Sequence, residues 1–233
     1  TSLILEINIS FLLNIIIYIV ILLPLHILFS RYLTSDNKSN EKGKGTIFFY
    51  WPALIVILVI VTLSDSITEG GIDAWAALYM RDSIKLEGFK LGIATICFNF
   101  SMLAGRLFAD KIRDKLGVHK FLISLLTTSL IGISIILSFN NIISSIIGFS
   151  VVGLGVSGII PLAYSLAGKI KGIDSAVGIS IISISAYGVF MVAPAFMGYI
   201  AKYFGINFVF APMLFFFCLS LVIVLINKKK FIL

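Results

Sequence analysis

The sequence predicts an all-α membrane protein, and its composition and the length of its apolar segments carry that prediction. Hydrophobic residues make up 59% of the 233 residues and charged residues 12%, whereas a soluble domain carries about 25% charged residues. A helix needs roughly 20 mostly apolar residues to cross a bilayer. Segments of that length lie at 8–29, 50–80, 89–109, 120–139, 142–168, 176–200 and 206–226. We therefore expect seven transmembrane helices embedded in a lipid bilayer.

Basic residues collect in alternate connections between these segments. The chain has 18 Lys and Arg residues and a formal net charge of +7. The opposite connections contain only four of these basic residues, Arg81, Lys85, Lys90 and Lys202. Loops rich in Lys and Arg face the cytoplasm, so the N-terminus is expected outside and the C-terminus in the cytoplasm. The positive charge therefore reflects membrane topology, and we expect no nucleic-acid partner.

The longest polar segment divides the chain into unequal parts. Residues 31–46 are rich in Ser, Asn, Lys and Gly, so they have too little apolar surface to offset the entropy of ordering. We expect a single helix at 1–30, a cytoplasmic linker at 31–46 and a six-helix bundle at 47–233. Because the chain starts outside the membrane without Met, we also expect it to be a piece of a longer protein.

Acidic residues interrupt the apolar segment at 50–80. Asp65, Glu69 and Asp73 follow an i, i+4, i+8 spacing, which places them on one face of a helix. An ionised carboxylate in hydrocarbon costs about 3 kcal/mol or more, so at least one is expected to be protonated or to have a polar partner on another helix. Either this face lines a water-filled cavity, or the helix is long and Glu69 and Asp73 lie among the outer headgroups. The glycine pair at 70–71 favours a local break there.

Other polar residues and prolines lie inside later spans. Asn99 and Tyr187 either reach the same cavity or make hydrogen bonds between helices. Pro161 and Pro194 each remove a backbone N–H from a predicted helix. We expect a bend near each proline, serving either as a static packing site or as a hinge.

A charged segment overlaps the end of the span at 89–109 and continues beyond it. Gly105, Arg106, Asp110 and Lys111 are expected in a cytoplasmic connection, where a carboxylate and nearby cations can form a charge network that holds one conformation and breaks in another. The alternative is an ordinary basic loop. We interpret these four residues as a candidate conformational gating loop.

The order of residue types in this segment resembles the short cytoplasmic signature of the major facilitator superfamily. Gly105 to Lys111 is the better match, and Asp114 to Gly117 is a second register. Weaker similarities to the family's seventh, tenth and eleventh helices lie at 69–79, at Gly153, Gly155 and Pro161, and at Tyr187, Gly188, Pro194 and Gly198. The segment 69–79 is similar to YbjJ-like bacterial members, and the charged segment to sugar-transporter-like ones.

The resemblance implies a secondary transporter of the bacterial inner membrane that works by alternating access. Six spans after a linker would be its C-terminal half, 1–30 the last helix of its N-terminal half, and the central cavity would lie between the halves. Protons are the expected coupling ion, and a small polar solute, metabolite or drug the expected substrate. A membrane sensor or scaffold is the alternative. His26 and His119 lie at helix ends and form no catalytic or zinc motif, so we expect no catalytic residue, cofactor or metal.

Overall fold

The computed structural model describes residues 20, 24, 51–170 and 172–231. The expected first span at 8–29 lies outside this described part except for its two isolated positions, and the expected linker at 31–46 lies outside it entirely. By their internal contacts, Thr1–Lys42 and Gly43–Leu233 are separate compact units. The second unit holds all the helices from α3 onward.

Helices make up nearly the whole described part, which contains no strand. They are α3 (Ala53–Asp82), α4 (Ile93–Leu116), α5 (Val118–Ser138), α6 (Ile142–Val156), α7 (Ile159–Ala167), α8 (Ser175–Phe204) and α9 (Ala211–Ile226). Short 3₁₀ turns lie at Gly88–Gly92, Ile206–Phe208 and Lys228–Phe231. Six helical segments are long and apolar enough to cross a membrane. The expected all-helical membrane fold is thus confirmed for this part of the chain.

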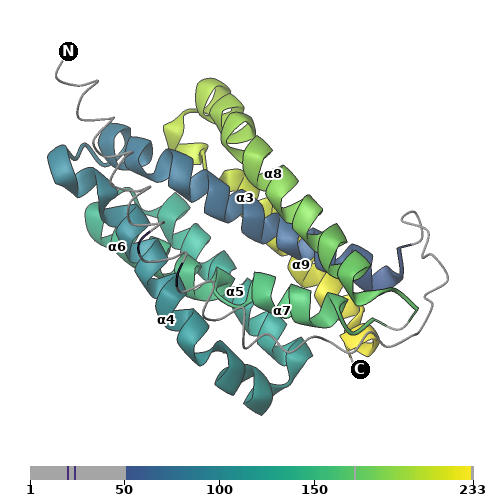
Figure 1. Cartoon of the computed structure of the whole chain (residues 1–233). Helices are drawn as coiled ribbons and strands as arrows, with labels where there is room; N and C mark the ends of the chain where they lie inside the picture. The colour runs from purple at the N-terminus through teal and green to yellow at the C-terminus, as the bar shows by residue number, and fades with distance from the viewer. Residues whose placement is uncertain (1–19, 21–23, 25–50, 171, 232–233) are drawn as a thin grey trace. The chain divides into compact units, whose positions relative to one another are not determined.

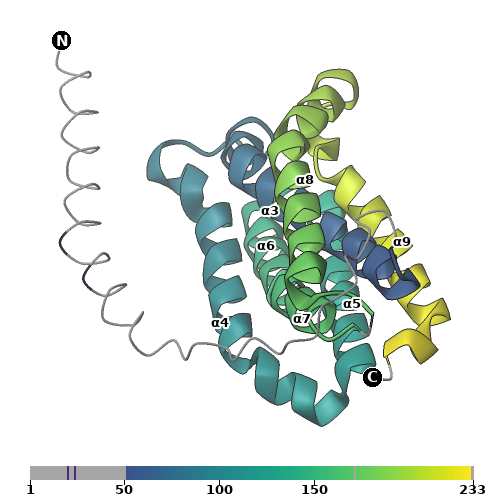
Figure 2. The same ribbon diagram turned by 45° about the vertical axis from the view of Figure 1, so that its right-hand side comes forward.

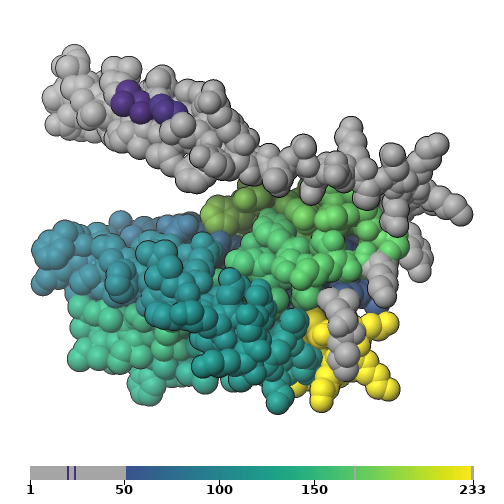
Figure 3. Space-filling model, turned by 60° about the horizontal axis from the view of Figure 1, so that its bottom comes forward, coloured from purple at the N-terminus to yellow at the C-terminus, as the bar shows by residue number. Residues whose placement is uncertain are grey.

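Helix α3 is the centre of this bundle. It contacts α8, α9, α7 and α4, while α6 packs between α4 and α5 (Figures 1 and 2). Much of α3 is buried around its whole circumference, as expected for a helix enclosed by neighbours. By contrast, α4 buries only Ala94 and Phe98, and its teal surface lies open in Figure 3 beside the green residues of α7 and α8.

Glycines on α6 bring its backbone close to both neighbouring helices. A Cβ at Gly153 would lie 3.1 Å from the backbone nitrogen of Met102 and closer still to the carbonyl oxygen of Phe98, both on α4. Gly155 is packed in the same way against Ser129 of α5. Lipid tails are as apolar as leucine side chains, so helices in a membrane associate through such close packing. The small residues of α6 therefore hold α4 and α5 together.

The expected span at 142–168 is confirmed as one membrane-capable segment, Ile142–Ala167, which consists of two helices. α6 ends at Val156, and α7 begins at Ile159 after Ser157 and Gly158. Pro161 explains this position, because a proline ring clashes with the carbonyl four residues earlier, which here belongs to Ser157. Pro194 has a milder effect, since α8 continues through it.

The expected loop at Gly105 to Lys111 is helical, which corrects the prediction for this segment. α4 runs on to Leu116 and ends at Gly117, whose φ of 78° lies in the left-handed region that favours glycine. The segment contains no proline, and Arg113 bonds Asp110 one turn earlier at 2.8 Å. Charged residues end an apolar segment in the sequence, but they do not end a helix.

Adding a methyl group to two helical glycines is expected to have opposite effects. Gly153→Ala should lower the free energy of unfolding by about 1–3 kcal/mol, because the new Cβ forces α4 and α6 apart. At Gly188 on α8, no described heavy atom lies within 4 Å of an added Cβ, so Gly188→Ala should raise it by up to about 1 kcal/mol. Thermal unfolding followed by circular dichroism in lipid nanodiscs measures both. Equal shifts for the two variants would contradict the close α4–α6 contact.

Candidate functional site

The three acidic residues of α3 pass from the interior of the bundle to its surface. Asp65 is fully buried, Glu69 is partly buried and Asp73 is exposed. α3 has 30 residues and is therefore about 45 Å long at about 1.5 Å per residue. Glu69 lies about 24 Å from its start by the same measure. The acidic face is thus near the middle of a membrane-spanning helix.

Glu69 forms an ion pair with Arg106 of α4. The Nη2 atom of Arg106 lies 3.2 Å from Oε1 of Glu69, and it also contacts the Met102 sulfur at 3.3 Å. Arg106 lies 13 residues after the start of α4, so both charges lie well away from the helix ends. The side chains are 45% exposed for Arg106 and 24% exposed for Glu69. The pair therefore borders an open space. Each residue also compensates the charge of the other in an apolar part of the bundle.

Asp65 is a buried carboxyl group without a hydrogen bond. Neither of its side-chain oxygens has a partner among the described residues, and the charged groups that act on it are Glu69 and Arg106. The neighbouring hydroxyls are engaged elsewhere: Ser64 bonds Ser220 at 2.6 Å, and Thr68 bonds the Ser64 carbonyl at 2.8 Å. An unpaired buried carboxyl group is costly and is characteristic of functional sites.

Asp73 and Asn99 lie at the more open end of the same face. The amide nitrogen of Asn99 donates to the Thr95 carbonyl one turn earlier on α4, at 3.0 Å. Both residues are exposed on this unit. Among the described residues, the polar side-chain bond that joins α3 to α4 is therefore the Glu69–Arg106 pair.

A pocket of about 180 Å³ opens beside the ion pair. It lies between α3, α4, α7 and α8, and it is lined by Ser66, Glu69, Arg106, Ile160, Tyr164, Ala186, Tyr187 and Phe190. Glu69 and Tyr187, two of the expected cavity residues, thus meet at one pocket, while Asp65, Asp73 and Asn99 do not line it. Gly105 instead packs against Ser157.

Arg106, Tyr164 and Phe190 also line the pocket. The sequence alone did not favour this position for any of the three. The sequence predicts a loop at Arg106, because the charged residues from Asp110 onward end the apolar segment. An uninterrupted helical register from Asn99 through Arg106 was the available signal, since residues seven apart lie on the same face of a helix. For Phe190 no such signal existed, because an aromatic residue in an apolar span faces lipid equally well.

One wall of the pocket depends on how α8 crosses α3. Pro194 has no N–H, so the carbonyl of Phe190 lacks its helical donor. A Cβ at Gly70 would lie 2.9 Å from that carbonyl oxygen, and the indole of Trp75 donates to the Pro194 carbonyl at 3.0 Å. The glycine pair at 70–71 therefore does not break α3 as expected. Gly70 lets the backbones of α3 and α8 approach, and Gly71 leaves room for the Met197 and Met213 side chains.

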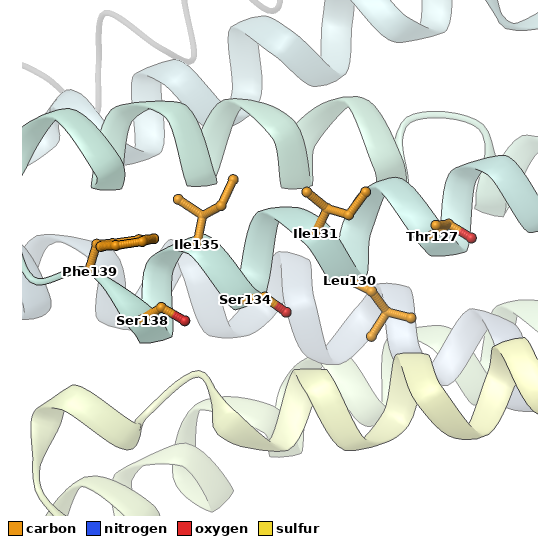
Figure 4. Close-up of a pocket in the computed structure, with 7 residues that line it drawn as sticks. All are labelled: Thr127, Leu130, Ile131, Ser134, Ile135, Ser138 and Phe139. Carbon is orange, nitrogen blue, oxygen red and sulfur yellow. The ribbon is translucent and has the colours of Figure 1, made fainter.

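A second hollow lies along the outer surface of α5. It has a volume of about 330 Å³ and is lined by Thr127, Leu130, Ile131, Ser134, Ile135, Ser138 and Phe139. Figure 4 shows all seven side chains along one helix and its end. The hollow contains no charged group, so it is an apolar groove suited to lipid. Among the described residues, no cluster of His, Cys, Asp or Glu is arranged to hold a metal ion.

Comparisons with known proteins place the chain in a family. The sequence profile described as Major Facilitator Superfamily matches residues 58–231, so the chain belongs to that superfamily of integral membrane transporters. It is 27% identical over 164 residues to an uncharacterized MFS-type transporter of Yersinia pestis, a match that covers 70% of this chain and 43% of the relative. It is 24% identical over 153 residues to membrane protein MosC of Rhizobium meliloti, covering 66% and 38%. The chain thus spans less than half the length of these relatives.

A double-mutant cycle is expected to detect the Glu69–Arg106 interaction. Each of Glu69→Gln and Arg106→Gln leaves the other charge uncompensated, so each should destabilise the protein. Removing both should cost less than the sum, with a coupling on the order of 1 kcal/mol, because the pair is partly exposed. Thermal unfolding in nanodiscs provides the measurement.

The matched control cycle combines Glu69→Gln with Arg113→Gln. Arg113 lies farther along the same helix and pairs with Asp110 and Asp114 instead. These two changes should be additive. An additive result for Glu69 and Arg106 as well would mean that their ion pair does not stabilise the bundle.

Proposed function

We propose that this chain is the C-terminal half of a proton-coupled secondary transporter. In this proposal it works by alternating access with a second six-helix bundle, and the substrate binds between the two. The observation that carries the proposal is the Glu69–Arg106 ion pair, which lies midway along two membrane-spanning helices at the edge of a pocket. A charge pair that served only packing would not need to be open on one side.

The proton step uses the competition of two carboxyl groups for one cation. Arg106 interacts electrostatically with both Asp65 and Glu69. Protonation of Glu69 would neutralise its charge and free Arg106, whereas deprotonation would restore the pair. Asp65 lies four residues deeper on the same face and is the second group that can carry the proton. In this scheme the proton and the substrate alter the same contact, which is the requirement for coupling.

The conformational step involves the residues around this site. Gly105 gives α4 a close contact with Ser157, at the break between α6 and α7. In our proposal, movement at this break and near Pro194 changes the width of the pocket, and Asp110 and Lys111 at the end of α4 exchange partners as the bundle rocks. We place this end of α4 in the cytoplasm and the protein in a bacterial inner membrane.

Replacing the carboxyl group at Glu69 is expected to uncouple proton movement. In proteoliposomes that contain the complete transporter, Glu69→Gln should reduce substrate-driven proton movement on the order of 100-fold, because an amide cannot bind and release the proton. Internal acidification is followed with a pH-sensitive dye, after addition of pools of small sugars, amino acids and organic acids. Asp65→Asn in the same assay should also lower it.

Glu87→Gln is the matched control for this assay. Glu87 is exposed and lies in the connection between α3 and α4, away from the pocket, so its removal should leave proton movement unchanged. Unchanged coupling in Glu69→Gln would remove Glu69 from the mechanism. Absence of proton movement with every pool in the unmodified protein would contradict proton coupling itself.

A further inference from the structure

The guanidinium group of Arg106 has an unused edge. Its Nη2 atom donates to Glu69 and to the sulfur of Met102, and the other guanidinium N–H groups have no hydrogen-bond partner within 51–170 and 172–231. The side chain is 45% exposed, about twice as much as its partner carboxylate. An arginine presents its donors in a rigid planar fork that matches a carboxylate. Arg106 can therefore accept an anionic group from the pocket.

The rest of the pocket is suited to an apolar or aromatic body. Ile160 and Phe190 are among its lining residues, and Tyr164 and Tyr187 add two aromatic rings with hydroxyl groups. The Tyr164 hydroxyl accepts from Ser183 at 3.3 Å. Its volume of about 180 Å³ equals roughly six water molecules at about 30 Å³ each. The pocket therefore fits a small solute, or the charged end of a larger one.

The charges around the pocket select the type of anion. Arg106 is the only cation among the described residues that line the pocket, so it neutralises one negative charge and not two. A monoanion is thus favoured over a phosphate dianion.

We propose that this pocket binds a small monocarboxylate with an apolar or aromatic body, held through Arg106. This inference rests on the transport function proposed above and gives that site a substrate class. The substrate carboxylate replaces Glu69 as the partner of Arg106, and Glu69 then takes up a proton from water, so the net charge in the bundle stays the same. The titratable groups that face Glu69 are Asp65 and Asp73 on its own helix and Arg106 on α4, and Tyr164 and Tyr187 share the pocket with it.

The experiment compares carboxylates with their uncharged amides. The complete transporter in lipid nanodiscs is titrated with lactate, benzoate and cyclohexanecarboxylate, and in parallel with lactamide, benzamide and cyclohexanecarboxamide. Apparent affinity is taken from the rise in unfolding temperature. At least one carboxylate should stabilise the protein where its amide does not. Arg106→Gln should weaken that binding on the order of tenfold or more, and Arg106→Lys should weaken it less, because the lysine keeps the charge.

Arg113→Gln is the matched control, since it removes an arginine from the same helix outside the pocket, and it should leave the carboxylate preference intact. The proposal is overturned if no carboxylate stabilises the protein more than its amide, or if Arg106→Gln keeps the preference. The binding assay uses no ion gradient. If the carboxylate preference is retained but the proton assay shows no coupling, the proposed transport mechanism is contradicted and this binding site is not. If coupling is present but no carboxylate is preferred over its amide, this binding site is contradicted and the transport mechanism is not.

Discussion

The pairing of Glu69 with Arg106 is the constraint on which the functional part of this bundle depends. A single charge in the apolar middle of a membrane-spanning helix is costly, and each of these residues relieves that cost for the other. The pair fixes which faces of α3 and α4 meet, and it places Arg106 at the pocket. Asp65 lies within the electrostatic reach of the same cation. One positive charge thus organises two carboxyl groups on the neighbouring helix.

Close contacts between helix backbones hold the helices that carry and surround this charge pair. Glycines on α6 let α4 and α5 pack closely against it. Gly70 on α3 leaves room for the carbonyl of Phe190, which has no helical hydrogen-bond donor because of Pro194. Helices packed through small residues lie near one another without large side chains between them. The break between α6 and α7 and the crossing of α8 over α3 are therefore at defined positions. Together they form the pocket between α3, α4, α7 and α8.

Composition and periodicity were sufficient for the membrane class and for most of the helices. The six apolar segments expected from residue 50 onward all correspond to spans in the described part, because hydrocarbon excludes charged residues and sets the length of a helix. The i, i+4, i+8 spacing of the acids on α3 was also visible. Prediction failed at Arg106, since a charged residue near the end of an apolar segment is read as the boundary of the helix. Here α4 continues to Leu116, because the segment contains no proline and its charged residues pair with one another along the helix.

The sequence by itself determined that this is a helical membrane protein, that its long apolar segments from residue 50 onward are membrane-spanning helices, and that one helix carries an acidic face. Hydropathy and helical period are local properties, so they can be read from the order of residues. Only the tertiary structure decided that Glu69 meets Arg106, that Asp65 is enclosed without a hydrogen bond and that Gly70 contacts the Phe190 carbonyl. Those contacts join residues far apart in the chain, and the rotation of each helix about its axis, which no local pattern specifies, selects them.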